Sequence, residues 1–140
     1  MSPICEARLV DALVHTGLVT SCMDISDGLG QSLLELAGAS NVGISINGDS
    51  IPLSTGVVEA SEILGCSWPE IVMGPGLDLK LLGTMADCDA SRNACDQLGI
   101  SIIGRTTTDR NLKWISRDNV SMKIEGYDQL KDDLLISLKN

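Results

Sequence analysis

Apolar residues in the first part of the chain follow helical and strand-like spacing in turn. Helical spacing in Pro3–His15, with Gly17 beyond it, predicts a first helix. A short apolar stretch at 18–23 then leads into an acidic turn. A second helix is expected after this turn, and residues 42–46 alternate like a strand. One face of the second helix carries Leu29, Leu33, Leu36 and Ala37.

The remaining sequence predicts further helices and strands in a less regular order. Ser54 or Thr55 can cap a helix that runs to Leu64, and 67–70 begins a short helix with a proline in its first turn. Residues 74–76 form a turn and 79–85 a buried strand. Asp89 can cap a helix that Gly99 closes. Strands are then expected at 100–104, 112–115 and 121–124, and a last helix through Leu130, Leu134 and Leu138.

Alternating elements early and clustered strands late predict an α+β fold. We expect a mixed, mostly antiparallel sheet flanked by helices, in a single domain that covers residues 1–140. Apolar residues make up 44% of the chain, which is enough for a packed core.

Composition excludes some classes of partner. The formal net charge is −9 and only 2% of residues are aromatic, so the chain lacks the clustered cations and stacking platforms that nucleic acids require. Five cysteines without a CxxC pair indicate reduced thiols, and no apolar run is long enough for a bilayer span. With no signal peptide at its start, the chain is expected in the cytoplasm.

The acidic turn is the strongest candidate for chemistry. Asp24 and Asp27 flank Ser26, and Gly28 follows at the expected start of the second helix. Two carboxylates at one corner can bind a hard divalent cation such as Mg²⁺, and the helix amides with the Ser26 hydroxyl can bind a phosphate oxygen. The alternative is that Ser26 or Asp27 simply caps the helix.

Segment 24–29, Asp-Ile-Ser-Asp-Gly-Leu, resembles the signature of thiamine-monophosphate kinases. These enzymes belong to the superfamily of aminoimidazole ribonucleotide synthetase, selenophosphate synthetase and the hydrogenase-maturation dehydratase. Weaker similarities follow in order along the chain at 39–43, 51–53, 103–105 and 126–128.

The resemblance implies a fold like the C-terminal domain of aminoimidazole ribonucleotide synthetase. It implies that Asp24 and Asp27 bind Mg²⁺, that Ser26 contacts ATP near Gly28, and that Asp78 belongs to the loop that binds thiamine monophosphate. Tyr127 either stacks on the substrate or packs against the sheet. The resemblance also implies that an N-terminal domain, absent here, supplies most ATP ligands and forms a homodimer, so the chain alone is expected to be inactive.

Departures from the family pattern lie in the substrate loop. Leu77 stands where the family has a glutamate assigned to substrate binding, and Lys80 replaces a second glutamate. Two alternatives to a thiamine-monophosphate kinase therefore stay open. One is a non-catalytic binding or regulatory relative, and the other is a kinase for another small phosphorylated acceptor.

Overall fold

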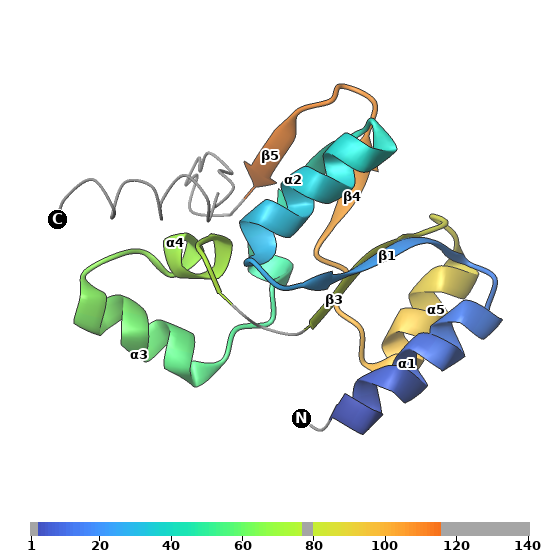
Figure 1. The fold of residues 1–140 in the computed structure, drawn as a ribbon, viewed down its shortest axis with the longest axis horizontal. Coiled ribbons are helices and arrows are strands. Elements are labelled where there is room, and N and C mark those ends of the chain that lie inside the picture. Colours follow the sequence, from blue (N-terminus) through green and yellow to red (C-terminus); the bar gives the residue numbers. More distant parts are fainter. Residues whose placement is uncertain (1–2, 77–79, 116–140) are drawn as a thin grey trace, which may run out of the picture.

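The computed structural model describes residues 3–76 and 80–115, which form helices and strands in alternation (Figure 1). The expected sites Asp78 and Tyr127, and the elements expected after residue 115, lie outside the described residues. In chain order the elements are α1 (Pro3–His15), β1 (Val19–Ile25), α2 (Leu29–Ser40), β2 (Gly43–Asn47), the 3-10 turn η1 (Gly48–Ser50), α3 (Thr55–Leu64), α4 (Trp68–Met73), β3 (Lys80–Met85), α5 (Asp89–Leu98), β4 (Gly104–Thr107) and β5 (Leu112–Ile115).

The strands form two separate ladders. β1 pairs with β3 in an antiparallel ribbon, while β2 lies between β4 and β5 in a three-stranded sheet. Within that sheet β2 is antiparallel to β4 and parallel to β5. The predicted α+β class with a mixed, mostly antiparallel strand arrangement is confirmed.

Helix α2 packs on both ladders and carries the largest share of the core. The face predicted from its spacing is buried, and Leu33 is only 1% exposed. This face meets Ile46 of β2, which is also 1% exposed, and Ile25 of β1. The core is completed by Leu82 of β3, Met73 of α4 and Trp114 of β5.

The strand expected at 100–104 is wrong, because β4 begins only at Gly104. The apolar residues before Gly104 contact two different parts of the structure. The Ile100 amide bonds to the Cys95 carbonyl at the end of α5, whereas Ile103 packs on the core and its carbonyl accepts from the Asn47 amide at 2.8 Å. The segment therefore crosses from a helix to the sheet without joining a ladder.

Helix ends follow the sequence with one correction. Gly17, Gly65 and Gly99 end α1, α3 and α5 as expected. Asp89 does not cap α5, because the N-cap position is Cys88 and Asp89 is the first helical residue. The carboxylate of Asp89 pairs with Arg92 at 3.2 Å instead.

Four described cysteines are free thiols, and only Cys95 is buried. Cys22 is exposed, while Cys66 and Cys88 are half-buried. Across residues 3–76 and 80–115, no helix has the length and apolar character that a bilayer span requires.

The turn between β4 and β5 is fixed by Asp109. The carboxylate of Asp109 accepts hydrogen bonds from Lys113, from the Thr107 hydroxyl at 2.7 Å and from the Asn111 amide at 3.3 Å. Lys113 first, and then the other two donors, lower the pKa of Asp109 to about 2. The carboxylate thus stays ionised while it holds the two strands that flank β2 in register.

The two tryptophan side chains of the chain contact each other beside η1. The ring centroids of Trp68 and Trp114 lie 5.6 Å apart, and the buried indole N–H of Trp114 has no hydrogen-bond partner among the residues that the structure describes. A Cβ atom at Gly48 would lie 2.3 Å from the Trp114 ring. Close packing of the backbone on this ring therefore requires glycine at position 48.

Gly48→Ala is expected to destabilise the fold by about 1–3 kcal/mol, because the added methyl group must displace a large buried ring. Urea unfolding followed by tryptophan fluorescence measures the loss. The matched control is Gly38→Ala, on an exposed part of α2 with open space around the new Cβ. This control should stabilise the helix by up to about 1 kcal/mol. Equal free energies of unfolding for both variants would contradict the packing at Trp114.

Candidate functional site

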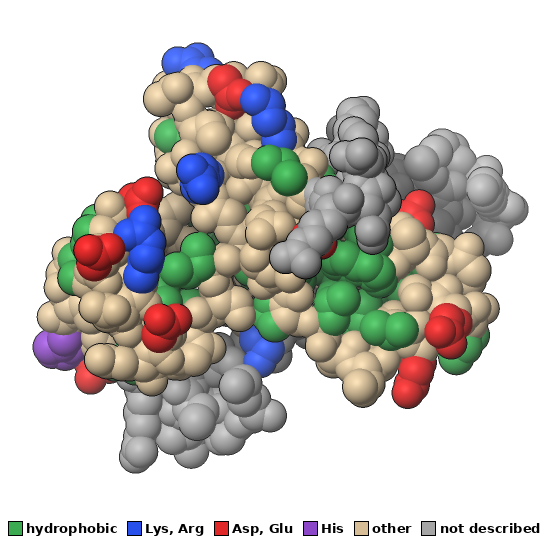
Figure 2. Space-filling view, turned by 180° about the vertical axis from the view of Figure 1, so that it is seen from behind, with side chains coloured by type: hydrophobic (Ala, Val, Ile, Leu, Met, Phe, Trp, Pro, Cys, Tyr) green, Lys and Arg blue, Asp and Glu red, His purple; other side chains and the backbone are tan. Residues whose placement is uncertain are grey.

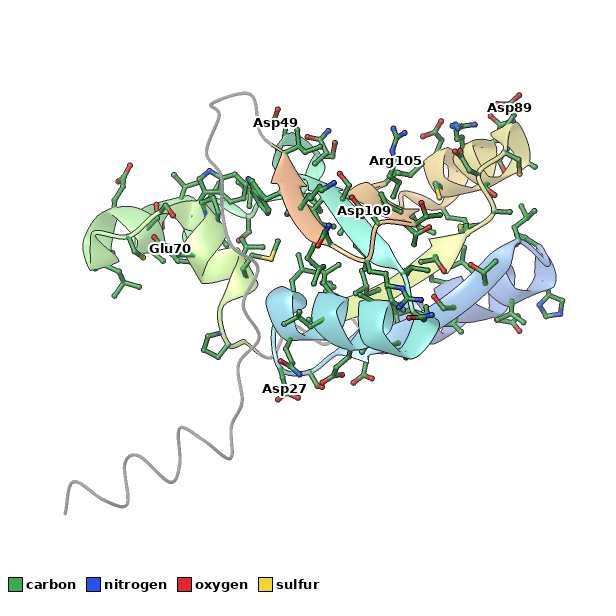
Figure 3. All side chains as sticks on the ribbon, turned by 90° about the horizontal axis from the view of Figure 1, so that it is seen from above. Asp27, Asp49, Glu70, Asp89, Arg105 and Asp109 are labelled. Carbon is green, nitrogen blue, oxygen red and sulfur yellow. The ribbon has the colours of Figure 1, made fainter. Side chains whose placement is uncertain are left out.

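The acidic segment forms an exposed corner between β1 and α2, as the sequence predicted. β1 extends to Ile25, two residues beyond the apolar stretch, so Asp24 belongs to the strand and not to the turn. Strand pleating points Ile25 into the core and leaves Asp24 exposed. Asp27 follows in the bend and projects at the start of α2 (Figure 3). Both carboxylates therefore lie at one corner and face solvent.

The start of α2 has no side-chain cap. Gly28 occupies the N-cap position, and neither Ser26 nor Asp27 accepts a hydrogen bond from the helix amides. The Ser26 hydroxyl instead donates to the Asp27 carboxylate at 3.4 Å. The capping alternative is therefore wrong, and no acidic residue lies in the first turn of α2. The free amides and the helix dipole are left to favour an anionic ligand.

Gly28 brings the corner into contact with the turn at 74–76. Its φ is 92°, and a Cβ atom there would lie 2.1 Å from the Gly74 carbonyl oxygen and 3.3 Å from the Gly76 nitrogen. Lys80 begins β3 on the far side of the loop and pairs with Ile25. The described residues on either side of the segment that resembles the substrate loop thus lie beside the acidic corner.

This contact between Gly28 and Gly74 was not predicted from the sequence. Each glycine belongs to a separate motif, and only the fold shows that they touch. The signal available in the sequence was a glycine in each motif, which permits close backbone approach but does not identify the partner.

The corner alone offers few ligands for a metal ion. Carboxylate and hydroxyl oxygens fit Mg²⁺, which prefers six oxygen ligands and often keeps several waters. Within the described part of the chain, no three side chains of His, Cys, Asp or Glu cluster in a way that could hold a metal. Asp24 and Asp27 can therefore supply part of a magnesium site, and phosphates, water or another domain must supply the rest.

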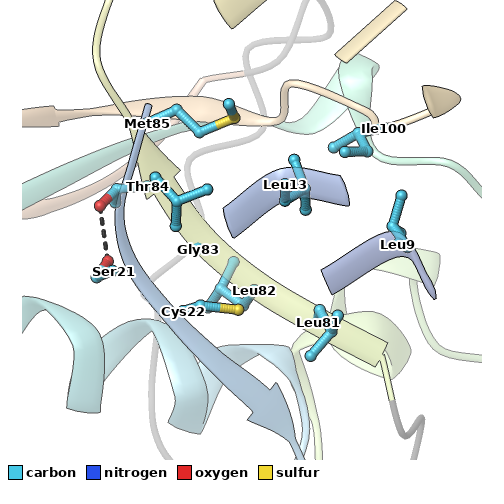
Figure 4. A pocket seen from close by; sticks show the side chains of 11 residues that line it. Leu9, Leu13, Ser21, Cys22, Leu81, Leu82, Gly83, Thr84, Met85 and Ile100 are labelled. Atoms are coloured by element: carbon cyan, nitrogen blue, oxygen red, sulfur yellow. Dashed lines mark hydrogen bonds between the residues drawn. The ribbon is translucent and has the colours of Figure 1, made fainter. Parts of the chain in front are cut away.

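A different concave region lies between α1 and the β1–β3 ribbon (Figure 4). Its volume is about 100 Å³, and its lining includes Leu9, Leu13 and Ile100 but none of the charged side chains that the structure describes. The polar side chains Ser21 and Thr84 hydrogen-bond to each other at 2.6 Å. An uncharged, apolar cavity cannot neutralise phosphate, so the acidic corner remains the candidate site.

Residues 3–115 match the model of the family described as AIR synthase related protein, C-terminal domain. The chain belongs to this family. The expected likeness of the fold to the C-terminal domain of aminoimidazole ribonucleotide synthetase is consistent with that assignment.

Relatives within the family include thiamine-monophosphate kinases. The chain is 35% identical over 103 residues to the thiamine-monophosphate kinase of Pyrococcus abyssi, which covers 71% of this chain and 30% of the kinase. The solved structure of AaThiL complexed with AMPPCP and TMP is 26% identical with a TM-score of 0.66, over 86% of this chain and 37% of that one. The predicted resemblance to the C-terminal domain of these kinases is confirmed, and the chain spans about a third of their length.

The same fold also occurs in proteins with other names. The hydrogenase maturation protein HypE has a TM-score of 0.73 at 16% identity, over 89% of this chain and 42% of that one. A likeness at this identity shows the fold alone. The fold alone therefore does not identify what this chain binds.

Gly28→Ala is expected to lower the free energy of unfolding by about 2 kcal/mol or more, because the methyl group meets the Gly74 carbonyl and the backbone is left-handed. The matched control is Gly76→Ala in the adjoining turn, where a new Cβ has no atom within 4 Å. The control should change the free energy by no more than about 0.5 kcal/mol. Chemical denaturation of the two variants side by side checks the contact, and similar losses from both would refute it.

Proposed function

We propose that this chain is the C-terminal part of an ATP-dependent kinase similar to thiamine-monophosphate kinase. Such an enzyme transfers the γ-phosphoryl group of ATP to thiamine monophosphate and gives thiamine diphosphate. The observation that supports this most directly is the uncapped start of α2, which follows two exposed carboxylates and contacts the 74–76 turn. Such a junction would bring a phosphate donor bound at the helix start next to an acceptor held by that turn.

Each residue of the corner has a role in this proposal. Asp24 and Asp27 hold part of the Mg²⁺ coordination, and Ser26 with the amides that follow Gly28 binds a phosphate oxygen. When bound, Mg²⁺ neutralises the negative charge that develops on the transferred phosphoryl group. Asp78, by its place in the sequence, belongs to the acceptor loop, and Tyr127 to the acceptor site.

A second domain is required for the reaction. The chain spans 30% of the Pyrococcus abyssi kinase and 37% of AaThiL, so most of each relative lies outside the matched region. We propose that an N-terminal domain supplies the remaining ATP ligands, forms the homodimer, and completes the enzyme in the cytoplasm. Since phosphoryl transfer depends on positioning several charged groups at once, this chain alone should not turn over.

A kinase for another acceptor, or a non-catalytic relative, is the second candidate. Leu77 cannot accept a hydrogen bond from a substrate amine, and exposed Lys80 brings a positive charge to the loop where relatives have a negative one. These two substitutions affect which small molecule can be phosphorylated. The signature residues Asp24, Ser26 and Asp27 are retained.

ATP consumption that depends on thiamine monophosphate tests the proposed function. We expect none from the chain alone and turnover once a matching N-terminal domain is added. Asp24→Asn and Asp27→Asn should each lower the affinity of the complete enzyme for Mg²⁺ at least about tenfold. Loss of a group that only supports a metal ligand already costs about this much. Asp96→Asn, an exposed carboxylate on α5, is the matched control and should retain activity.

Two results would contradict the proposal. Turnover by the isolated chain would show that a complete site already exists in it. Silence from the mixture, with the two parts shown to associate, would favour the non-catalytic relative.

Leu77→Glu restores a carboxylate that can accept a hydrogen bond at the position where the family has a glutamate. In the complete enzyme this variant should bind thiamine monophosphate roughly tenfold more tightly or better, because a substrate amine would regain a hydrogen-bond partner. Calorimetric titration of wild type and variant measures the change. Unchanged affinity would indicate a loop remodelled for a different acceptor.

A further inference from the structure

Lys80 places a positive charge beside the start of α2. It begins β3 and lies directly opposite Ile25, the last residue of β1. Residues that lie directly opposite each other in an antiparallel ribbon have their side chains on the same face. The Ile25 side chain is buried in the core cluster that also contains Leu29, the first residue of α2. The Lys80 side chain therefore leaves the ribbon on the face that carries the start of α2, and it is exposed there.

The chain that precedes Lys80 lies beside the same helix start. A Cβ atom at Gly28 would lie 3.3 Å from the Gly76 nitrogen, and Gly76 precedes Lys80 by only a few residues. The strand pairing adds an orientation, because Asp24 lies opposite Leu81 and so projects from the other face of the ribbon. Lys80 and Asp24 thus leave the ribbon on opposite faces, with Lys80 on the side of the helix amides.

Lys80 is separate from the other lysine and arginine side chains that the structure describes. These belong to α5 or to the β4–β5 hairpin, and they are Arg92, Arg105, Arg110 and Lys113. Figure 2 shows lysine and arginine side chains gathered over that part of the molecule. Within residues 3–76 and 80–115, Lys80 is therefore the described basic side chain that can contact a ligand at the start of α2.

Two features at this place favour the same kind of ligand. The first amides of α2 have no side-chain cap, and the helix dipole favours negative charge beside them. The ammonium group of a lysine has three donors and binds phosphate oxygens as a point charge. Since the nearby carboxylates repel a phosphate, a cation on the helix side of the corner lowers this repulsion for a phosphate that lies against the amides.

We propose that Lys80 binds a phosphate group at the start of α2, beside the Mg²⁺ assigned to Asp24 and Asp27. The inference rests on the proposed function for the presence of a phosphate at this corner. It adds a binding residue from β3, which lies outside the Asp-Ile-Ser-Asp-Gly-Leu segment. The phosphate can belong to ATP or to the acceptor, and the experiment distinguishes these two sources.

Residue-resolved NMR of the full 140-residue chain measures the binding directly. The isotopically labelled chain is titrated with ATP and, separately, with thiamine monophosphate, each with Mg²⁺ in excess. The amide signals of Leu29, Gly30 and Gln31 should shift with the ligand whose phosphate lies at the helix start. Lys80→Gln should weaken that binding about threefold to tenfold, because one charged contact to phosphate is lost at an exposed position.

Two further variants serve as controls. Lys80→Arg keeps the positive charge and should retain most of the affinity, whereas Arg105→Gln removes a charge from β4 and should bind like wild type. Added salt should weaken binding by the wild type more than binding by Lys80→Gln, because screening acts on the charge that this variant lacks. Urea unfolding is measured alongside, since a role of Lys80 in stability alone would lower the unfolding midpoint and leave the phosphate affinity unchanged.

Three results would overturn this inference. They are unshifted α2 amides with both ligands, equal affinity of wild type and Lys80→Gln for both ligands, or an equal loss from Arg105→Gln. Dependence on Lys80 in the ATP titration alone assigns the phosphate to the donor, and dependence in the thiamine monophosphate titration alone assigns it to the acceptor.

ATP consumption by the complete enzyme separates this inference from the proposed function. Phosphate binding that depends on Lys80, without turnover, supports the role of Lys80 and refutes the kinase. Turnover by an enzyme whose phosphate affinities are unchanged by Lys80→Gln does the reverse.

Discussion

The burial of one face of α2 is the interaction on which the arrangement of this chain depends. The two strand ladders share no strand, yet Leu33 contacts the same core as Ile25 of one ladder and Ile46 of the other. Because α2 is held by this core, its first turn is fixed at the end of β1. The acidic corner therefore takes its position from apolar packing, and the carboxylates themselves remain in solvent.

Backbone proximity completes the corner. Gly28 ends the bend, opens α2 and contacts the Gly74 carbonyl, and no residue with a Cβ atom fits there without displacement. A single glycine thus brings the uncapped helix start and the two carboxylates next to the 74–76 turn. The same geometry explains why the helix has no side-chain cap, since the N-cap position is occupied by a residue that has no side chain.

Most elements could be predicted from the sequence because apolar spacing and glycine positions are local signals. The buried face of α2, the corner after β1 and the short helix with Pro69 are examples. The signals that failed are those that depend on distant partners. Ile100 lines the cavity beside α1 and Ile103 packs on the core, so the apolar character of this segment does not reflect a strand. The contact between Gly28 and Gly74 and the exposure of Ile63 likewise follow from the tertiary fold and have no local pattern.

The distribution of charge limits what the acidic corner can bind. The chain carries a net charge of −9, and among the described cations Arg92 is paired with Asp87 and Asp89, while Lys113 is paired with Asp109. Lys80, which begins β3, lies beside the acidic corner, but two exposed carboxylates there still need further positive charge before a phosphate can bind. At the corner a divalent ion can supply it and admit a phosphate, which carboxylates alone would repel. The acidic corner therefore becomes a favourable site for a phosphate only when a cation is brought to it.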